Sequence, residues 1–142
     1  MQINLWVLTI TRNIMQVFYD NRPSILEKVG DGSYRYRWNI TDVKMPNDMM
    51  MGDNEETRTQ WNCEEVIIFA PLSPNKITEK VIAELWDSNY EQKLLNEYNA
   101  STLGMYDEET ATNKINKYKD FLRQREAIKH QIDEDCKILN II

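Results

Sequence analysis

Few residues of this sequence have the types and spacing of catalytic groups. The one histidine, His130, has no serine, cysteine or second histidine at a spacing that would make it a general base or a metal ligand. Two carboxylate clusters, Glu64-Glu65 and Asp133-Glu134-Asp135, lack a sequence context that would raise the pKa of one member. We expect these side chains to be solvated and the protein to have no catalytic residue. An enzyme with an unfamiliar site centred on Glu64, Glu65 and Arg58 is the alternative.

Glycines and acidic runs do not form a recognisable cofactor site. The segment Gly30-Asp31-Gly32 lacks the third glycine and the following helix of a dinucleotide fingerprint, and the remaining glycines make no phosphate-binding loop. The acidic segment Asp48–Glu56 lacks the ordered oxygen ligands and the flanking helices of a calcium-binding EF-hand. No metal or other cofactor is therefore expected.

The charge and the hydrophobicity of the sequence argue against nucleic-acid and membrane partners. The 142 residues hold 17 Lys and Arg against 23 Asp and Glu, divided as 7 against 10 in residues 1–72 and 10 against 13 in residues 73–142. Neither half presents the basic face of a nucleic-acid binder, so direct nucleic-acid binding is not expected. No apolar run approaches the roughly 20 residues of a membrane span, so no membrane partner is expected.

Cys63 and Cys136 lie far apart, which predicts two reduced, buried thiols.

Two groups of residues could instead bind another protein. Arg35 and Arg37 alternate with Tyr36 and Trp38, so a strand here would carry arginines on one face and aromatic rings on the other. The arginines could hold a carboxylate-rich partner. The triplet Met49-Met50-Met51 is flexible apolar material of the kind used at adaptable interfaces. In the simpler interpretation, the arginines are the solvated side of the strand and the methionines belong to a loop or to local core.

A β-rich first half must position these residues. The segment Tyr34–Thr41 alternates large apolar with polar side chains and is the clearest strand. The turn-forming cluster Gly30–Ser33 precedes it, which predicts a hairpin between Ser24–Val29 and Tyr34–Val43. The six-residue apolar run Leu5–Ile10 is too short for a secretory signal and is expected to be a further strand.

A second long strand is predicted from Arg58 to Ala70. Both of its faces become apolar after Glu65, which indicates a strand end that is covered on both sides. The pair Glu64-Glu65 would then mark a bulge or an exposed stretch. Between the two long strands, Met45–Thr57 is rich in Asn, Asp and Glu and is expected to form a long loop.

From Ser73 onward the sequence changes to helical spacing. Ser73 fits an N-cap, Ser88 with Glu91 has the spacing of a capping box, and Gly104 is a suitable stop. The fold class is therefore α+β, with an N-terminal antiparallel sheet domain in residues 1–72 followed by a helical region in residues 73–142. The three helices are predicted over about 74–87, 89–104 and 107–139.

The last helix is expected to be long. From Glu108 to Leu139 it would span about 48 Å. A helix of this length buries its apolar stripe only against another long helix, so Tyr90–Gly104 is expected to pack back along it. The rest of the stripe would meet a partner or a second copy, and a homo-oligomer is expected. The stripe residues assigned to these contacts are Tyr118, Leu122, Ile128 and Ile132.

Three segments share a likeness with one group of proteins. Gly32–Asn39, Trp61–Val66 and the stretch from Tyr118 to Asp133 resemble small proteins encoded in virion and tail gene modules of gut Bacteroides bacteriophages and prophages. The shared features are packing patterns, so no functional residue is carried over. The resemblance implies a virion component in a tail, collar or fibre attachment, made in the host bacterial cytoplasm and bound to other phage structural proteins or to itself. A non-virion binding protein, such as a tail or fibre assembly chaperone or a host-protein inhibitor, is the alternative.

Overall fold

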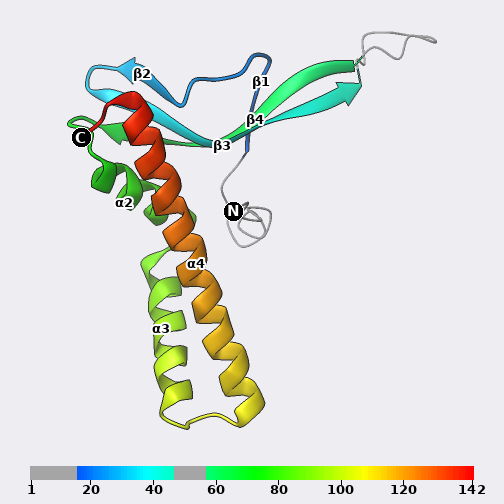
Figure 1. The fold of residues 1–142 in the computed structure, drawn as a ribbon, viewed down its shortest axis with the longest axis vertical. Helices are drawn as coiled ribbons and strands as arrows, with labels where there is room; N and C mark the ends of the chain where they lie inside the picture. Colours follow the sequence, from blue (N-terminus) through cyan, green and yellow to red (C-terminus); the bar gives the residue numbers. More distant parts are fainter. Residues whose placement is uncertain (1–15, 47–56) are drawn as a thin grey trace. The chain divides into compact units, whose positions relative to one another are not determined.

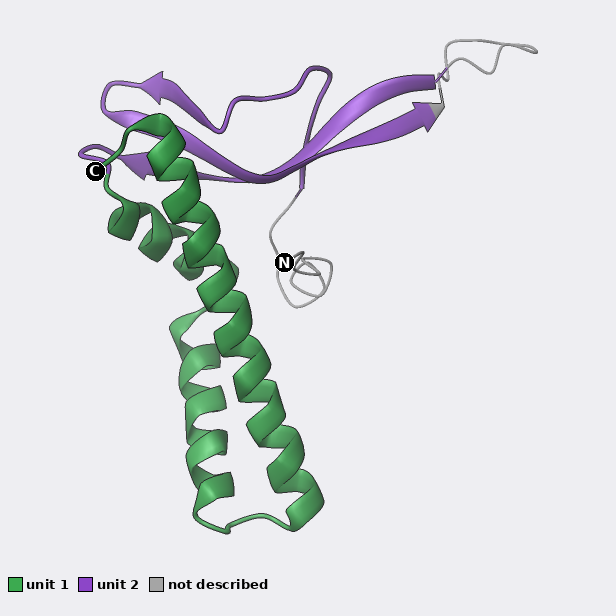
Figure 2. Ribbon diagram, in the orientation of Figure 1, with its two compact units in different colours: residues 1–12, 73–142 green, residues 13–72 purple. Residues whose placement is uncertain are grey.

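The computed structural model describes residues 16–46 and 57–142 (Figure 1). The described residues form two compact units: the first holds the sheet and extends to Leu72, and the second holds the helices from Ser73 to Ile142 (Figure 2). The predicted α+β class, with an antiparallel sheet followed by helices of which the last is long, is confirmed. The predicted strand Leu5–Ile10 and the segment Asp48–Glu56, with its three methionines, lie outside the described residues.

Four antiparallel strands form the sheet in the order β1-β4-β3-β2. The predicted hairpin is confirmed, because Leu26 pairs with Tyr36 and Gly30 pairs with Ser33. Gly32 lies in the turn with a φ of 71°, a conformation that glycine adopts without the strain of a Cβ atom. The strands are Val17–Tyr19 (β1), Leu26–Gly30 (β2), Ser33–Pro46 (β3) and Thr57–Phe69 (β4).

One face of the sheet is buried and the other is partly open. Tyr36 and Trp38 are buried and stack with their ring centroids 5.9 Å apart, and Val66, the cross-strand partner of Tyr36, is buried with them. On the opposite face, Ile67 is 37% exposed and Phe69 is 64% exposed. The prediction that this end of β4 is covered on both sides is therefore wrong. A strand with apolar side chains on both faces is not always covered by another helix or sheet on both faces.

A β-bulge interrupts β3. Trp38 pairs with Glu64 whereas Thr41 pairs with Asn62, so β3 takes three steps where β4 takes two. Asn39 lies in the bulge with a φ of 56°, a left-handed conformation that asparagine tolerates better than most residues. The predicted alternation therefore ends at Trp38. The expectation of a bulge or an exposed stretch at Glu64-Glu65 is wrong, because the extra residue is in β3 and Glu64 is buried.

Three helices follow, and their ends are set by local hydrogen bonds. The Ser73 hydroxyl accepts from the Lys76 N–H at 3.1 Å, as predicted. The second cap lies one residue earlier than predicted: Asp87 Oδ1 accepts from the Tyr90 N–H at 2.7 Å, and Ser88 is the first helical residue. Gly104, with a φ of 77°, follows the second helix as predicted. The helices are Pro74–Leu85 (α2), Ser88–Thr102 (α3) and Glu108–Leu139 (α4).

Aromatic rings hold α3 against α4. The Tyr98 and Tyr118 centroids lie 5.0 Å apart, and Phe121 meets Trp86 at 5.0 Å and Tyr90 at 6.2 Å. These edge-on and tilted contacts are favourable arrangements for aromatic pairs. The expectation that the second helix packs back along the third is confirmed, and Figure 1 shows the two running side by side as a helical hairpin.

The helix α4 is continuous through its charged middle. Arg125, which interrupts the apolar stripe, pairs with Glu91 of α3 at 3.6 Å, and Lys114 pairs with Glu97 of α3 at 3.2 Å. These cross-helix ion pairs flank the aromatic contacts. Asn140 ends the helix in the left-handed conformation.

Candidate interaction surfaces

The connection between β1 and β2 crosses the sheet. β1 lies beside β4 at one edge and β2 lies beside β3 at the other, so residues 20–25 must pass over the two central strands. Three interstrand spacings amount to about 14 Å, which six extended residues can span. Two contacts show which face they cover: the Arg22 guanidinium lies 5.2 Å from the Trp61 ring centroid, and the Ser24 carbonyl accepts from Arg37 Nη1 at 3.0 Å.

Arg37 is the centre of the polar contacts beneath this connection. Its Nη2 donates to Glu27 Oε1 at 2.8 Å and to the Tyr19 hydroxyl at 3.1 Å, and its Nε donates to Glu65 Oε2 at 3.2 Å. Tyr19 in turn donates to the Glu65 carboxylate at 3.0 Å. Burial lowers the pKa of the Arg37 guanidinium, but its hydrogen bonds to Tyr19 and Glu27 outweigh that effect and leave the pKa raised.

The candidate binding residues of the sheet are thus largely engaged within the chain. Arg37 is only 2% exposed, so its prediction as part of a solvated face is wrong. Arg35 is less buried and pairs with Glu65 at 3.0 Å and with Glu27 at 3.3 Å. Tyr36 and Trp38 belong to the buried face. A partner would reach Arg35 more readily than the other three.

The four stripe residues predicted on α4 differ in how far they are exposed. Ile128 and Ile132 are buried within the chain and offer little surface to another molecule. Tyr118 is half-buried between Tyr98 and Phe121. Leu122 is 42% exposed. Of the predicted stripe, Leu122 therefore presents an open apolar side chain to a partner.

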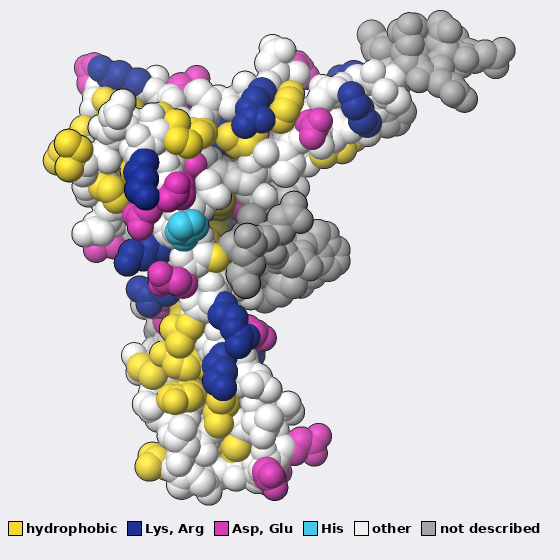
Figure 3. Space-filling view, viewed as in Figure 1, with side chains coloured by type: hydrophobic (Ala, Val, Ile, Leu, Met, Phe, Trp, Pro, Cys, Tyr) yellow, Lys and Arg dark blue, Asp and Glu magenta, His cyan; other side chains and the backbone are white. Residues whose placement is uncertain are grey.

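The loop between α3 and α4 carries exposed apolar side chains that were not predicted. Leu103 is 77% exposed, Met105 is 73% exposed and Tyr106 is also exposed. Asp107-Glu108-Glu109 follows directly, and residues 99–112 contain no Lys, Arg or His. Figure 3 shows acidic side chains at this end of the hairpin. We call Leu103–Glu109 the hairpin tip. Apolar residues on both sides of Gly104 mark this loop in the sequence, but they do not reveal that the side chains are exposed, because apolar residues next to a helix-ending glycine usually pack back on the helix.

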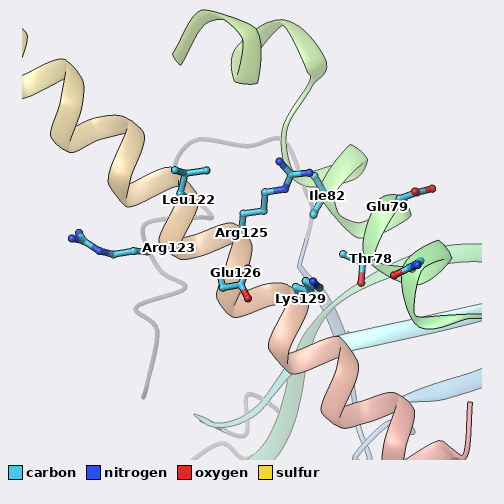
Figure 4. Close-up of a pocket in the computed structure, with 9 residues that line it drawn as sticks. Thr78, Glu79, Ile82, Leu122, Arg123, Arg125, Glu126 and Lys129 are labelled. Atoms are coloured by element: carbon cyan, nitrogen blue, oxygen red, sulfur yellow. The ribbon is translucent and has the colours of Figure 1, made fainter. Parts of the chain in front are cut away.

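A groove of about 660 Å³ lies between α2 and the middle of α4, and we call it the α2–α4 groove (Figure 4). Ile82 of α2 and Leu122 of α4 supply apolar surface to it. Arg125 extends from α4 toward Ile82, and Lys129 lies one turn further along α4. A second hollow of about 490 Å³ shares Ile82 and Arg125 and continues toward Trp86.

The charges of this groove are mixed and close to balanced. Three cations, Arg123, Arg125 and Lys129, line it against two carboxylates, Glu79 and Glu126. In Figure 4 Arg123 points away from α2, and its guanidinium pairs with Asp120 at 2.9 Å. The groove was not predicted, because its two walls come from helices that lie about 45 residues apart in the sequence.

Among the residues that the structure describes, the remaining reactive side chains form no metal-binding cluster. Within residues 16–46 and 57–142, no three His, Cys, Asp or Glu side chains are placed to hold a metal ion, and no helix there is long and apolar enough to cross a membrane. His130 is exposed, and Cys63 and Cys136 are free and buried, as predicted. Burial, with the nearby Glu65 charge, raises the pKa of the Cys63 thiol to about 11.

One further carboxylate expected in solvent is buried. Asp135 lies on the same side of α4 as Ile132 and Cys136, and its Oδ1 accepts from Gln131 Nε2 at 3.0 Å. The prediction of solvated side chains is thus wrong for Asp135 as it is for Glu64. Sequence clustering of acids does not reveal which of them faces the core of the fold.

Comparison of the chain with protein-family models, with curated proteins and with solved structures finds no match.

Proposed function

We propose that this chain is a structural component of a bacteriophage particle, in its tail, collar or fibre attachment, and that it acts through protein–protein contacts of its helical hairpin. The resemblance of the sequence to virion and tail-module proteins supports the place in a particle. The exposed apolar side chains of the hairpin support the mode of action. The protein would be made in the host bacterial cytoplasm and carried in the particle.

The observation that carries the proposal is the exposure of Leu103 and Met105. Single exposed apolar residues are ordinary on protein surfaces, but here they occupy one short loop. The helix α3 ends in a Schellman motif with two backbone hydrogen bonds. The Gly104 N–H donates to the Ser101 carbonyl oxygen at 3.3 Å, and the Met105 N–H donates to the Ala100 carbonyl oxygen at 3.0 Å. In that motif the residue at the position of Met105 usually packs back on the helix, whereas this methionine is 73% exposed. Its side chain is therefore available to a partner.

Leu122 extends the apolar surface toward α2. In Figure 3 apolar side chains run along the hairpin and are bordered by Lys and Arg side chains. An apolar centre with a charged border is the composition of many protein–protein interfaces. The hairpin thus offers both a projecting end and a flank for stoichiometric contacts.

Quantitative mass spectrometry of purified particles, produced from the genome that encodes this chain, tests the proposal. A particle component is expected at a fixed copy number relative to the major structural proteins. Presence during assembly together with absence from mature particles would contradict the proposal and assign the chain to an assembly chaperone. Absence at both stages would point to a host-protein inhibitor.

A further inference from the structure

One side of the helical hairpin carries a row of open apolar side chains. Ile115, Tyr118 and Leu122 recur at a spacing of three and four along α4 and therefore share a face, as do Leu95 and Tyr98 along α3. The ring contact between Tyr98 and Tyr118, at 5.0 Å, joins the two faces. We call these five residues the hairpin flank. Leu95 is 36% exposed, Leu122 is 42% exposed and the other three are half-buried.

The other side of the hairpin is closed within the chain. There Lys114 pairs with Glu97 at 3.2 Å, and Tyr90 meets Phe121 edge-on at 6.2 Å. Lys114 and Phe121 each precede a flank residue by one position, so they lie about 100° away around α4. Two helices cover only one stripe of each other, whereas a four-helix bundle encloses its apolar faces. The open flank is therefore the surface that a second pair of helices would cover.

The charges of the hairpin are divided along its length. Residues 99–112, at the tip end, hold Asp107, Glu108 and Glu109 and no Lys or Arg, which gives a formal charge of −3. Residues 87–98 and 113–129, in the remainder of the hairpin, hold seven Lys and Arg against five Asp and Glu, which gives +2. Lys119, in the positive part, is exposed and forms no ion pair with any residue that the structure describes.

This division of charge favours a second copy of the hairpin as the occupant of the flank. In an antiparallel pair, the negative end of each copy lies beside the positive part of the other, so the attraction occurs twice. A parallel pair would instead place two negative ends together. We infer that two copies of this chain pair through the hairpin flank, antiparallel and about a two-fold axis near Ile115, and so form a four-helix bundle. The inference rests on the proposed function and names one partner of the hairpin.

The position of the axis follows from the spacing of the flank and the charges. Ile115 lies seven residues from Glu108 and seven from Leu122, so an axis there brings Glu108 of one copy level with Leu122 of the other. Lys119 precedes Leu122 by three residues, which is about 4.5 Å along the helix. Lys119 of each copy then lies within one turn of Glu108 of the other, and the two Ile115 side chains meet at the axis.

Light scattering after size-exclusion chromatography, over a range of concentrations, measures the pairing. The weight-average mass is expected to rise from 16.9 kDa and to stop at twice that value, because a two-fold contact closes on itself. A mass of 16.9 kDa at every concentration would overturn the inference and leave the flank to a protein of different sequence. A mass that continues to rise beyond the dimer would overturn it as well.

Charge reversal tests the antiparallel orientation. Glu108→Lys and Lys119→Glu are each expected to weaken the pairing about tenfold, and the two together in one chain are expected to restore part of the loss. Lys117→Glu is the matched control: it makes the same change of charge at an exposed position on another face of α4, and it is expected to pair as the wild type does. Equal weakening by Lys117→Glu and Lys119→Glu would contradict the proposed contact.

Substitution of the apolar residues tests the surface itself. Leu95→Ser/Leu122→Ser is expected to weaken the pairing by a factor of about a hundred or more, because each dimer loses four leucine contacts. Ile138→Ser, at an exposed apolar position of α4 outside the hairpin flank, is expected to pair as the wild type does. Unchanged circular dichroism establishes that both variants are folded. Undiminished pairing of the folded flank variant would overturn the inference.

A cysteine at position 115 tests the position of the axis. Ile115→Cys is expected to form a disulfide between two copies under mild oxidation, because the side chain meets its own copy there. Leu95→Cys is not, because its two copies would be separated by roughly 18 Å along the helices. The wild type, whose Cys63 and Cys136 are buried, is the control. A dimer that crosslinks at Leu95→Cys but not at Ile115→Cys would exclude the proposed arrangement.

These measurements are independent of the copy number in particles, which tests the proposed function. A monomeric chain that is present in particles at a fixed copy number would remove the pairing alone. A paired chain that is absent from particles would remove the proposed function alone.

Discussion

The Arg37 guanidinium donates a hydrogen bond to the Ser24 carbonyl oxygen over 3.0 Å, and this contact ties the connection between β1 and β2 to the sheet. The same guanidinium meets Tyr19 of β1, Glu27 of β2 and Glu65 of β4. A residue of β3 thus touches each of the other strands and the segment that crosses over them. Arg37 therefore has a structural role in the sheet unit.

Arg37→Met is expected to destabilise the protein by roughly 3 kcal/mol, because it removes the buried guanidinium that binds Ser24, Glu27 and Glu65 at once. Urea unfolding measures this loss. Arg35→Gln is the matched control: the Arg35 side chain is 33% exposed, so its ion pairs are screened and the expected cost is below about 1 kcal/mol. Equal losses for the two variants would contradict the central role of Arg37.

The N-cap of α3 gives a second prediction. Asp87→Ala is expected to cost about 1 kcal/mol, because the Tyr90 N–H loses the carboxylate oxygen that it reaches at 2.7 Å. Ser88→Ala is expected to have little effect, because Ser88 is already helical and alanine favours the helix. Thermal unfolding of the two variants distinguishes them, and a larger loss for Ser88→Ala would place the cap one residue later.

The Cys63 thiol gives a third prediction, on alkaline pH. Its pKa is raised from 9.0 to about 11 in the folded protein, so folding favours the protonated thiol. That stability is fully present below about pH 9 and is lost as the pH rises through 11, by at most about 1.4 kcal/mol per pH unit. The free energy of unfolding of the wild type, compared with that of Cys63→Ala, measures the effect. An identical pH dependence in both proteins would contradict it.

The elements that the sequence predicted best depend on local signals. Alternation around Tyr36, the turn glycine Gly32 and the cap Ser73 act within a few residues, and each was located correctly. The α3 cap was misplaced because Asp87 and Ser88 are both good cap residues and the choice between them depends on a single hydrogen bond. Local signals therefore predict that an element exists more reliably than they predict its first residue.

The parts that escaped prediction depend on contacts between distant segments. Arg37 is buried because residues 20–25 cross the sheet above it, as the strand order requires. No short sequence pattern predicts this strand order. The α2–α4 groove likewise joins Ile82 to Leu122, 40 positions further along the chain. The hairpin tip was missed for a different reason: Leu103 and Met105 belong to no periodic stripe, and only the structure shows that they stay exposed.

The copy number of tip variants in purified particles tests whether the helical hairpin attaches this chain to its partners. Leu103→Ser/Met105→Ser is expected to lower incorporation by a factor of about ten or more, because the loss of two apolar contacts weakens binding by at least about 1.4 kcal/mol. The control Ile138→Ser, at an exposed apolar position of α4 outside the tip and the groove, is expected to be incorporated as the wild type is. Wild-type copy number for the tip variant, in infectious particles of normal composition, would contradict the claim that the helical hairpin makes the contact.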